Sequence, residues 1–173
     1  SPSTDAPVAP PLLPPTAPRH NYSLLKEAIV FKPLRDWGTK IAISTPTVNR
    51  DIHLRLQYDL ARGERVGCFA PLKDNLARCE HVRLVFQGEG PANTLEIRLP
   101  DEDGSTVGYS WPDATKSAQG TATVIPLEEM THLAGGDGFM DWTRVTTIQF
   151  NITKSNGGQG GRGKLTLKEI KFF

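Results

Sequence analysis

Short segments in which apolar and polar residues alternate, separated by turn residues, run through the chain from about residue 27. In the clearest of them, residues 52–60, five apolar residues from Ile52 to Leu60 alternate with polar ones. This period of two is that of a strand with one buried face. Further strands are predicted at 28–31, 40–44, 82–87, 95–99, 107–111, 121–127, 146–153 and 165–172.

Turn signals between these segments favour antiparallel pairing. Asp101-Glu102-Asp103-Gly104 has the residues of a tight reversal, so segment 107–111 is the predicted hairpin partner of the strand before it. Helical signals are weak and confined to one or two turns at 72–79 and at 127–133. A parallel sheet would need crossover helices. Roughly eight to ten short strands instead predict an all-β fold, an antiparallel β-sandwich of the jelly-roll type.

The chain of 173 residues is long enough for one domain with a real core. Residues 1–20 are rich in Pro, Ala, Ser and Thr, a composition that favours extended conformations and buries no core. We expect a linker or a disordered terminus at 1–20 and the sandwich at 21–173. Because the chain opens on Ser1 without Met, a fragment or a mature product is expected.

Charge and hydropathy exclude two classes of partner. The net charge is +1 and no basic block stands out, so nucleic acid is not expected. No apolar run approaches the length of a membrane span. Cys68 and Cys79 would bridge in an exported protein and stay small buried thiols in the cytosol, so both states remain open.

The outward residues of the predicted strands are the informative ones. They are rich in Gln, Asn, Arg and His, side chains that give fixed, multi-point hydrogen bonds of the kind that sugar hydroxyls need. An ordinary solvated sheet face is the alternative. The residues are His53, Arg55, Gln57, Arg83, Val85, Gln87, Glu96, Arg98, Thr147, Gln149 and Asn151.

Aromatic rings near strand ends are candidates for stacking on a sugar ring. Trp37 lies in a predicted turn, and Trp111 lies at the end of its strand, before Pro112. Tyr109 and Trp111 share their parity with Val107, which favours the core, but the strand end at Trp111 would allow its ring to turn outward. Tyr58 and Trp142 are expected in the core or under a loop.

Catalytic and metal-binding motifs are missing from the sequence. It has no nucleophile elbow, no His-Glu-x-x-His and no Cys/His ligand spacing. A carboxylate pair for glycoside hydrolysis is the serious enzyme alternative, but Asp101 and Asp103 read as turn residues and Glu128 and Glu129 as a helix start. No cofactor is assigned. Sandwich modules often hold one structural calcium through scattered oxygens, so calcium is expected without named ligands.

The order of segments resembles the galactose-binding-like jelly-roll modules, in particular family 11 carbohydrate-binding modules and the related CIA30-like domains. The resemblance covers residues 28–173. It rests on AIVFKPLRDW, LRLQYDL, HVRLVFQGEGPANTLEIRLPDEDGSTVGYSW, TATVIPLEEM, DWTRVTTIQFNI and GKLTLKEIKFF. Lys168-Glu169-Ile170 stands where such modules usually have D-x-I, and the tyrosine-rich cleft typical of family 11 is not reproduced.

The resemblance implies a ligand lying across a concave sheet. The predicted carbohydrate-binding residues are Trp37, Arg83, Gln87, Glu96, Arg98, Tyr109, Trp111, Gln149 and Asn151. We expect a secreted or cell-surface, non-catalytic module that binds a polysaccharide or oligosaccharide and targets an enzyme or receptor joined through the Pro-rich linker. The alternatives are a protein-assembly module of the CIA30-like type and a small glycan-cleaving enzyme.

Overall fold

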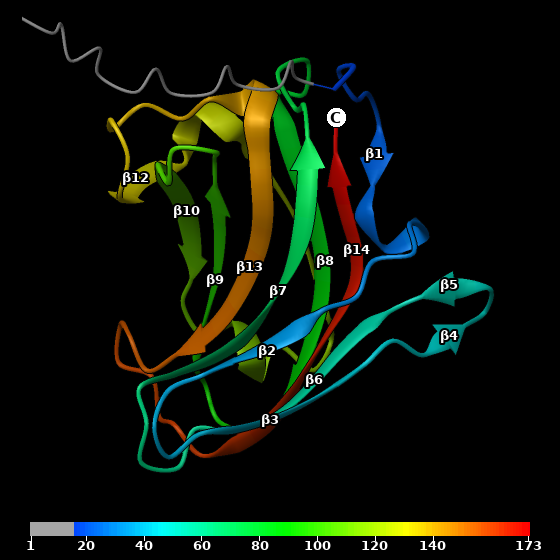
Figure 1. The fold of residues 1–173 in the computed structure, drawn as a ribbon. Coiled ribbons are helices and arrows are strands. Elements are labelled where there is room, and N and C mark those ends of the chain that lie inside the picture. Colours follow the sequence, from blue (N-terminus) through cyan, green and yellow to red (C-terminus); the bar gives the residue numbers. More distant parts are fainter. Residues whose placement is uncertain (1–15) are drawn as a thin grey trace, which may run out of the picture.

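Two antiparallel sheets of six strands pack face to face in the computed structural model, which describes residues 16–173 (Figure 1). Sheet I has the strand order β12-β10-β9-β13-β7-β2. Its strands are β2 (Lys32–Arg35), β7 (Arg65–Asp74), β9 (Thr94–Pro100), β10 (Thr106–Trp111), β12 (Thr131–Ala134) and β13 (Val145–Thr153).

Sheet II has the order β11-β8-β14-β6-β3, with β1 added beside β14. Its strands are β1 (Tyr22–Ser23), β3 (Lys40–Ser44), β6 (Leu54–Asp59), β8 (His81–Glu89), β11 (Thr121–Pro126) and β14 (Arg162–Phe172). Two further strands, β4 (Thr47–Val48) and β5 (Asp51–Ile52), form a separate hairpin that projects from the molecule (Figure 1).

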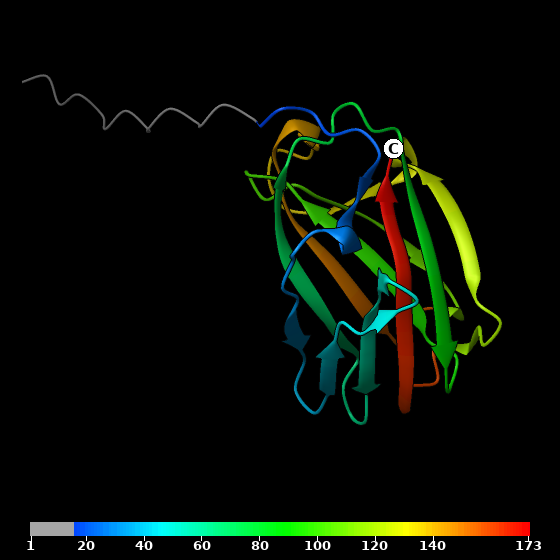
Figure 2. The same cartoon turned by 90° about the vertical axis from the view of Figure 1, so that its right-hand side faces the viewer.

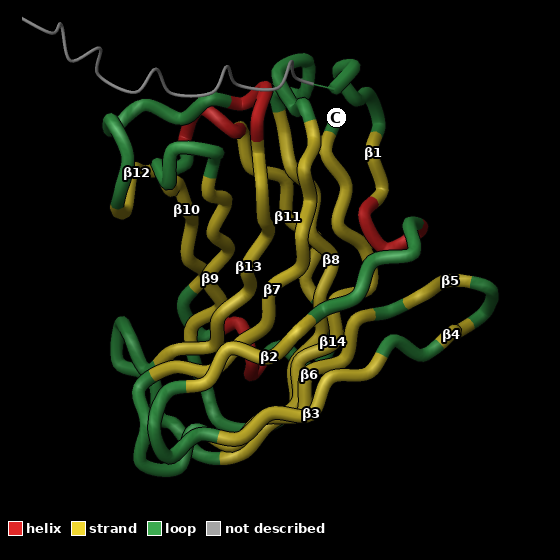
Figure 3. Tube along the Cα trace, in the orientation of Figure 1, coloured by secondary structure: helices red, strands yellow, loops and turns green. Residues whose placement is uncertain are grey.

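The described helices are single 3-10 turns between strands (Figure 3). They are η1 (Leu24–Lys26), η2 (Ala114–Lys116), η3 (Leu127–Glu129) and η4 (Trp142–Arg144). Among residues 16–173, no helix is long and apolar enough to cross a membrane.

The core lies between the two sheets and is built from the inward residues of each strand. Leu54, Leu56 and Tyr58 of β6 are buried while Gln57 between them is exposed. Phe86 from sheet II and Phe150 from sheet I are almost completely buried in the same cluster. The alternation therefore has the physical cause that the sequence indicated, because every second side chain leaves water.

The predicted antiparallel sandwich is confirmed, and most predicted strands match observed ones within a few residues. Residues 40–44 form β3, and β9 pairs with β10 in the predicted hairpin around Asp101 and Gly104. Gly104 has a φ of +91°, a left-handed conformation that glycine adopts without steric cost.

Two local predictions are wrong and a third, the helical turn at 127–133, is confirmed only in part. Residues 72–79 are not helical, because 72–74 continue β7 and the following loop turns Leu76 and Cys79 into the core. Residues 127–133 divide between η3 and β12. The strand expected at 28–31 instead lies at Lys32–Arg35, although Phe31 is buried.

Both cysteines are free and buried. Cys68 is an inward residue of β7, where burial raises the pKa of its thiol to about 12. The Cys79 thiol lies 3.2 Å from the carbonyl oxygen of Arg19 and donates to it. The two residues act here as small core side chains.

The last residues of the Pro-rich segment pack on the sandwich. The Arg19 amide donates to the Asn75 carbonyl at 2.9 Å, and its guanidinium pairs with Asp74 at 3.1 Å and lies 4.5 Å from the centre of the Tyr22 ring. The chain is thus fixed to the sandwich from about residue 16. Residues 1–15, and with them most of the predicted linker, lie outside the described residues.

Replacing Phe150 tests the core. Phe150→Ala removes a fully buried ring and leaves a cavity between the sheets, so we expect a loss of about 3–5 kcal/mol in the free energy of unfolding, measured by urea titration. Val124→Ala on β11, where the side chain is 46% exposed, is the matched control and should change stability by less than about 0.5 kcal/mol. Equal effects of the two changes would contradict the described packing.

Replacing Gly67 tests the close approach of β7 and β13. A Cβ atom at residue 67 would lie 2.0 Å from the Phe150 carbonyl oxygen and 2.6 Å from Oδ1 of Asn151. Gly67→Ala should therefore destabilise the fold by about 1–3 kcal/mol, while Ser110→Ala on the exposed side of β10 should be near neutral. Thermal unfolding of the two variants measures the difference, and unchanged stability of Gly67→Ala would refute this contact.

Candidate functional site

Four predicted site residues form one cluster on the outer face of sheet I. In the register of β13 against β9, Gln149 lies opposite Arg98 and Asn151 lies opposite Glu96. The guanidinium of Arg98 donates to Glu96 through Nε at 2.5 Å, and the Asn151 amide donates to the same carboxylate oxygen at 3.2 Å. These contacts hold three side chains in one fixed arrangement on the sheet surface.

A depression of about 280 Å³ lies beside this cluster. Its walls come from β13 and β9 on one side and from β2 and β7 on the other. Gly67 of β7 has no side chain, and Asn151 of β13 occupies the space into which a side chain at 67 would project. The residues that line it are Leu34, Arg35, Asp36, Arg65, Arg98, Gln149 and Asn151.

The depression offers hydrogen-bonding groups of both kinds. Arg65 and Asp36 face each other with 4.0 Å between Nε and Oδ2, and both side chains are more than 40% exposed. Among the described residues, the amide of Gln149 makes no hydrogen bond, so its donor and acceptor are both available to a ligand.

Two aromatic residues are neighbours, in the sequence or in the sheet register, of residues that line the depression, although neither lines it itself. Trp37 is 80% exposed in the turn between β2 and β3, next to the lining residue Asp36. This turn is closed by a hydrogen bond from the Thr39 amide to the Asp36 carbonyl, and Gly38 takes a φ of +79°. Phe69 of β7 is half-buried and lies opposite Gln149 in the sheet register. A sugar ring can stack on such exposed aromatic faces.

The prediction that Arg83 and Gln87 share a sheet with this cluster is wrong. Both belong to β8 of sheet II, whose outer face points away from sheet I (Figure 2). Arg83 pairs with Glu169 at 3.2 Å, and the Gln87 amide donates to the Ala118 carbonyl at 2.7 Å. Alternation assigns residues to the faces of a strand but does not say to which sheet the strand belongs.

Tyr109 and Trp111 also lie outside the cluster. They point to the inner side of β10, as their parity with Val107 indicated, and both are half-buried. The Trp111 ring packs against Tyr109 with centroids 4.9 Å apart and against Phe86 of sheet II at 6.2 Å. The core position that parity favoured is therefore found for both rings, and the outward turn considered for Trp111 is not.

Several residues of the depression were missed in the sequence. Val66, Cys68, Ala70 and Leu72 alternate in β7 and would have placed Arg65 and Phe69 on the outer face. The sequence does not show this pattern clearly, because Gly67 and Pro71 stand at outward positions of β7 where a strand usually has polar residues. Arg35 and Asp36 lie at a strand end, where no periodicity identifies them.

The carboxylates in the acidic turn between β9 and β10 accept hydrogen bonds from backbone amides of that turn and of a neighbouring loop. Oδ1 of Asp101 accepts from the amides of Asp103 and Ser105, and its Oδ2 accepts from the Asp141 amide at 2.8 Å. Burial and a hydrogen bond with Asp103 raise the pKa of Asp101, and the same hydrogen bond lowers the pKa of Asp103. These carboxyl groups tie two loops together.

No group of three or more His, Cys, Asp or Glu side chains is arranged to hold a metal ion within residues 16–173. The expected calcium had no assigned ligands and stays a prediction. The carboxylate that lines the depression, Asp36, faces Arg65, and the nearby Glu96 is bound by Arg98 and Asn151. Glycoside hydrolysis uses two carboxyl groups that flank the bond to be cleaved, whereas these two carboxylates contact neighbouring side chains.

Sequence comparison finds no protein-family model that matches the chain, and no curated protein matches it. Solved structures do match in shape. A family 11 carbohydrate-binding module from Clostridium thermocellum, solved with a β-1,3-1,4-mixed-linked tetrasaccharide, superimposes with a TM-score of 0.66 at 15% identity. The alignment covers 83% of this chain and 88% of that one.

Two other similar structures extend the comparison. The family 11 module of the C. thermocellum cellulosomal cellulase Lic26A-Cel5E matches 91% of this chain and 96% of its own, with a TM-score of 0.67 and 13% identity. An exo-β-agarase matches 88% of this chain but only 25% of its own, at 9% identity and a TM-score of 0.57. The chain has the jelly-roll β-sandwich fold of the family 11 carbohydrate-binding modules.

Proposed function

We propose that this chain is a non-catalytic carbohydrate-binding module whose ligand, a polysaccharide or oligosaccharide, lies on the outer face of sheet I. The observation that carries the proposal is the depression lined by Arg98, Gln149 and Asn151, in which hydrogen-bonding side chains are held on the outer side of sheet I. The shared fold with family 11 modules supports it, since one of them was solved with a bound tetrasaccharide.

Fixed side chains favour the binding of a flexible, hydroxyl-rich ligand. Glu96 accepts from both Arg98 and Asn151, so these residues lose little conformational freedom when a sugar binds. Gln149 supplies an amide that can donate to one hydroxyl and accept from its neighbour. Trp37, which follows the lining residue Asp36 in the sequence and is 80% exposed, can cover the apolar face of a pyranose ring.

The site is shallow, which sets the expected strength of binding. A depression of about 280 Å³ buries part of a few sugar units and leaves the rest in water. The net gain is small, and we expect dissociation constants on the order of micromolar to millimolar. A module of this kind acts by keeping an attached domain near its substrate, because tethering raises the local concentration.

The Pro-rich start of the chain is the proposed connection to that attached enzyme or receptor, in a secreted or cell-surface protein. Pro-rich segments are semi-rigid spacers. The contacts of Arg19 with Asp74 and Asn75 fix the point at which such a spacer would leave the sandwich. The spacer would then be held at a defined place on the surface.

The proposal is tested by affinity electrophoresis in gels that contain one neutral polysaccharide each, including mixed-linkage β-1,3-1,4-glucan, agarose and xylan. The wild-type chain should be retarded by at least one of them. Arg98→Ala and Gln149→Ala should each weaken that binding by about ten-fold or more, because each removes hydrogen bonds to the ligand.

Trp111→Ala and Gln87→Ala are the matched controls. The Trp111 ring packs against Phe86 and the Gln87 amide donates to the Ala118 carbonyl, both away from the proposed site, so retardation should be kept as long as circular dichroism shows a folded chain. Failure of the wild type on a broad panel of neutral glycans would refute the proposed function. Loss of binding in Gln87→Ala alone would move the site to sheet II.

A further inference from the structure

The outer face of sheet II has a different chemistry from that of sheet I. Figure 2 shows its strands side by side, with β14 near the centre of the face. Basic side chains come from four of these strands, whereas acidic side chains on them are fewer, although the whole chain carries a net charge of only +1. The basic residues are Lys40, Arg55, Arg83, Arg162, Lys164, Lys168 and Lys171, and the acidic ones on the same strands are Asp59, Glu89 and Glu169.

Each acidic residue of this face is already paired. Arg162 contacts Asp59 at 3.0 Å, Lys164 contacts Glu89 at 3.4 Å, and the third acid, Glu169, pairs with Arg83. Within the described part of the chain, Lys40, Arg55 and Lys168 have no ion pair. These three basic groups make no ion pair there, although Asp51 lines the same depression as Lys168 and Asp59 lies opposite Lys40 in the sheet register.

Arg55 gives a second, independent sign of a missing partner. Its Nε atom is buried but donates to nothing within residues 16–173. A buried donor on a charged group is costly to leave unpaired, so such atoms are usually satisfied by an anion or by water. Burial, followed by the positive charges of Lys168 and Arg55, lowers the pKa of the neighbouring His53, although Asp51 acts in the opposite direction.

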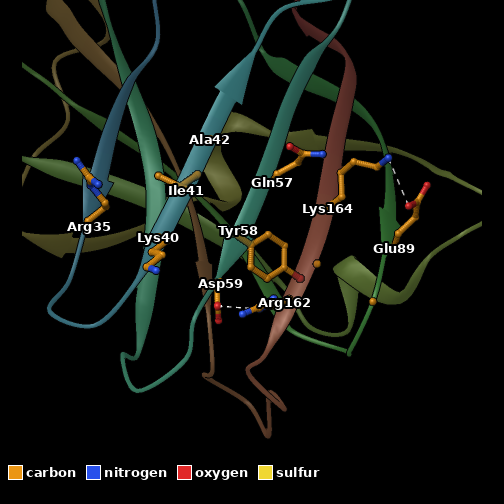
Figure 4. Close-up of a pocket in the computed structure, with 12 residues that line it drawn as sticks. Arg35, Lys40, Ile41, Ala42, Gln57, Tyr58, Asp59, Glu89, Arg162 and Lys164 are labelled. Atoms are coloured by element: carbon orange, nitrogen blue, oxygen red, sulfur yellow. Dashed lines mark hydrogen bonds and ion pairs between the residues drawn. The ribbon is translucent and has the colours of Figure 1, made fainter.

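The same face is hollowed at one end. A cleft of about 890 Å³ lies across β3, β6 and β14. In Figure 4, Arg35 and Lys40 lie on one side of it and Lys164 and Glu89 on the other, while Arg162 lies beside Asp59, below Tyr58. The hydroxyl group of Tyr58 is buried and also unpaired among the described residues.

The residues of this cleft combine two functions that an acidic sugar requires. The ammonium of Lys40 and the guanidinium of Arg35 can pair with a carboxylate or a sulfate. The exposed amide of Gln57 can pair with ring hydroxyls, and the small side chain of Ala42 opposite it leaves space for the ring.

A second depression lies further along β14, so the ligand is expected to be extended. It has a volume of about 580 Å³ and is lined by Lys26, Arg50, Lys168 and Lys171 together with Asp51 and Glu169. Lys164 in the first hollow and Lys168 in the second are four steps apart along β14, a distance of about 13 Å at a rise of about 3.3 Å per residue. One chain of a few sugar units can reach both.

We propose that the outer face of sheet II is a second binding face and that it takes a polysaccharide carrying carboxylate or sulfate groups. It adjoins the site on sheet I at Arg35 of β2, the one described residue that lines both hollows. Acidic side chains interspersed among the basic ones disfavour the continuous row of phosphates in a nucleic acid. They suit a chain in which charged and neutral groups alternate. This inference does not depend on the ligand of sheet I.

Affinity electrophoresis in gels containing polygalacturonate, dextran sulfate or uncharged dextran tests the proposal. The full chain should be retarded by at least one of the two acidic polymers and not by dextran, and the retardation should fall as salt screens the charges. Comparing the two acidic polymers shows whether carboxylate or sulfate is preferred.

The decisive variant is Lys40→Gln combined with Lys168→Gln, which removes two basic groups that have no ion pair in the described part of the chain. We expect binding to the acidic polymer to weaken by about three- to ten-fold, the loss of two exposed ionic contacts. The control, Lys32→Gln with Arg78→Gln, changes the net charge equally at exposed residues on other surfaces and should bind within about two-fold of the wild type.

Three results would overturn the proposal. These are equal weakening in the control, no retardation by either acidic polymer, or tighter binding to a double-stranded DNA than to the acidic polymers at the same salt concentration. Arg98→Ala should leave binding to acidic polymers unchanged. Failure on sheet II can thus be distinguished from failure of the site on sheet I.

Discussion

Burial of every second side chain between two sheets is the constraint on which this structure depends. Phe86, Phe150 and Phe172 are almost fully withdrawn from water, and each lies in a strand whose intervening residues point outward. Because the two sheets pack core to core, their outer faces point in opposite directions. The chain thereby presents two separate polar surfaces, and any function must be assigned to one of them.

Much of the fold could be predicted from this alternation, and the failures have physical reasons. Strands such as β3 and β6 were found because their inner residues are strictly apolar. β7 was not predicted because Gly67 and Pro71 replace the polar outward residues that mark a strand. Gly67 is at this position because Asn151 lies against it, which is a contact between residues far apart in the sequence.

The candidate site was predicted only in part, for a related reason. Glu96, Arg98, Gln149 and Asn151 belong to neighbouring strands, and the predicted alternation placed each of them correctly on an outer face. Arg83 and Gln87 have the same local pattern but belong to the other sheet. Sheet membership follows from strand pairing across the whole chain, which local periodicity does not encode.

The two outer faces differ in how their charges are compensated, and this difference explains why one fold can hold two kinds of ligand. On sheet I, Glu96 accepts from both Arg98 and Asn151, so the cluster is close to neutral and rigid and suits uncharged hydroxyl groups. On sheet II, the acidic residues are too few for the basic ones, and Arg55 keeps a buried donor without a partner. A neutral sugar cannot compensate that charge, whereas an anionic one can. In the proposed functions, a neutral sugar therefore binds the outer face of sheet I and an anionic sugar binds the outer face of sheet II.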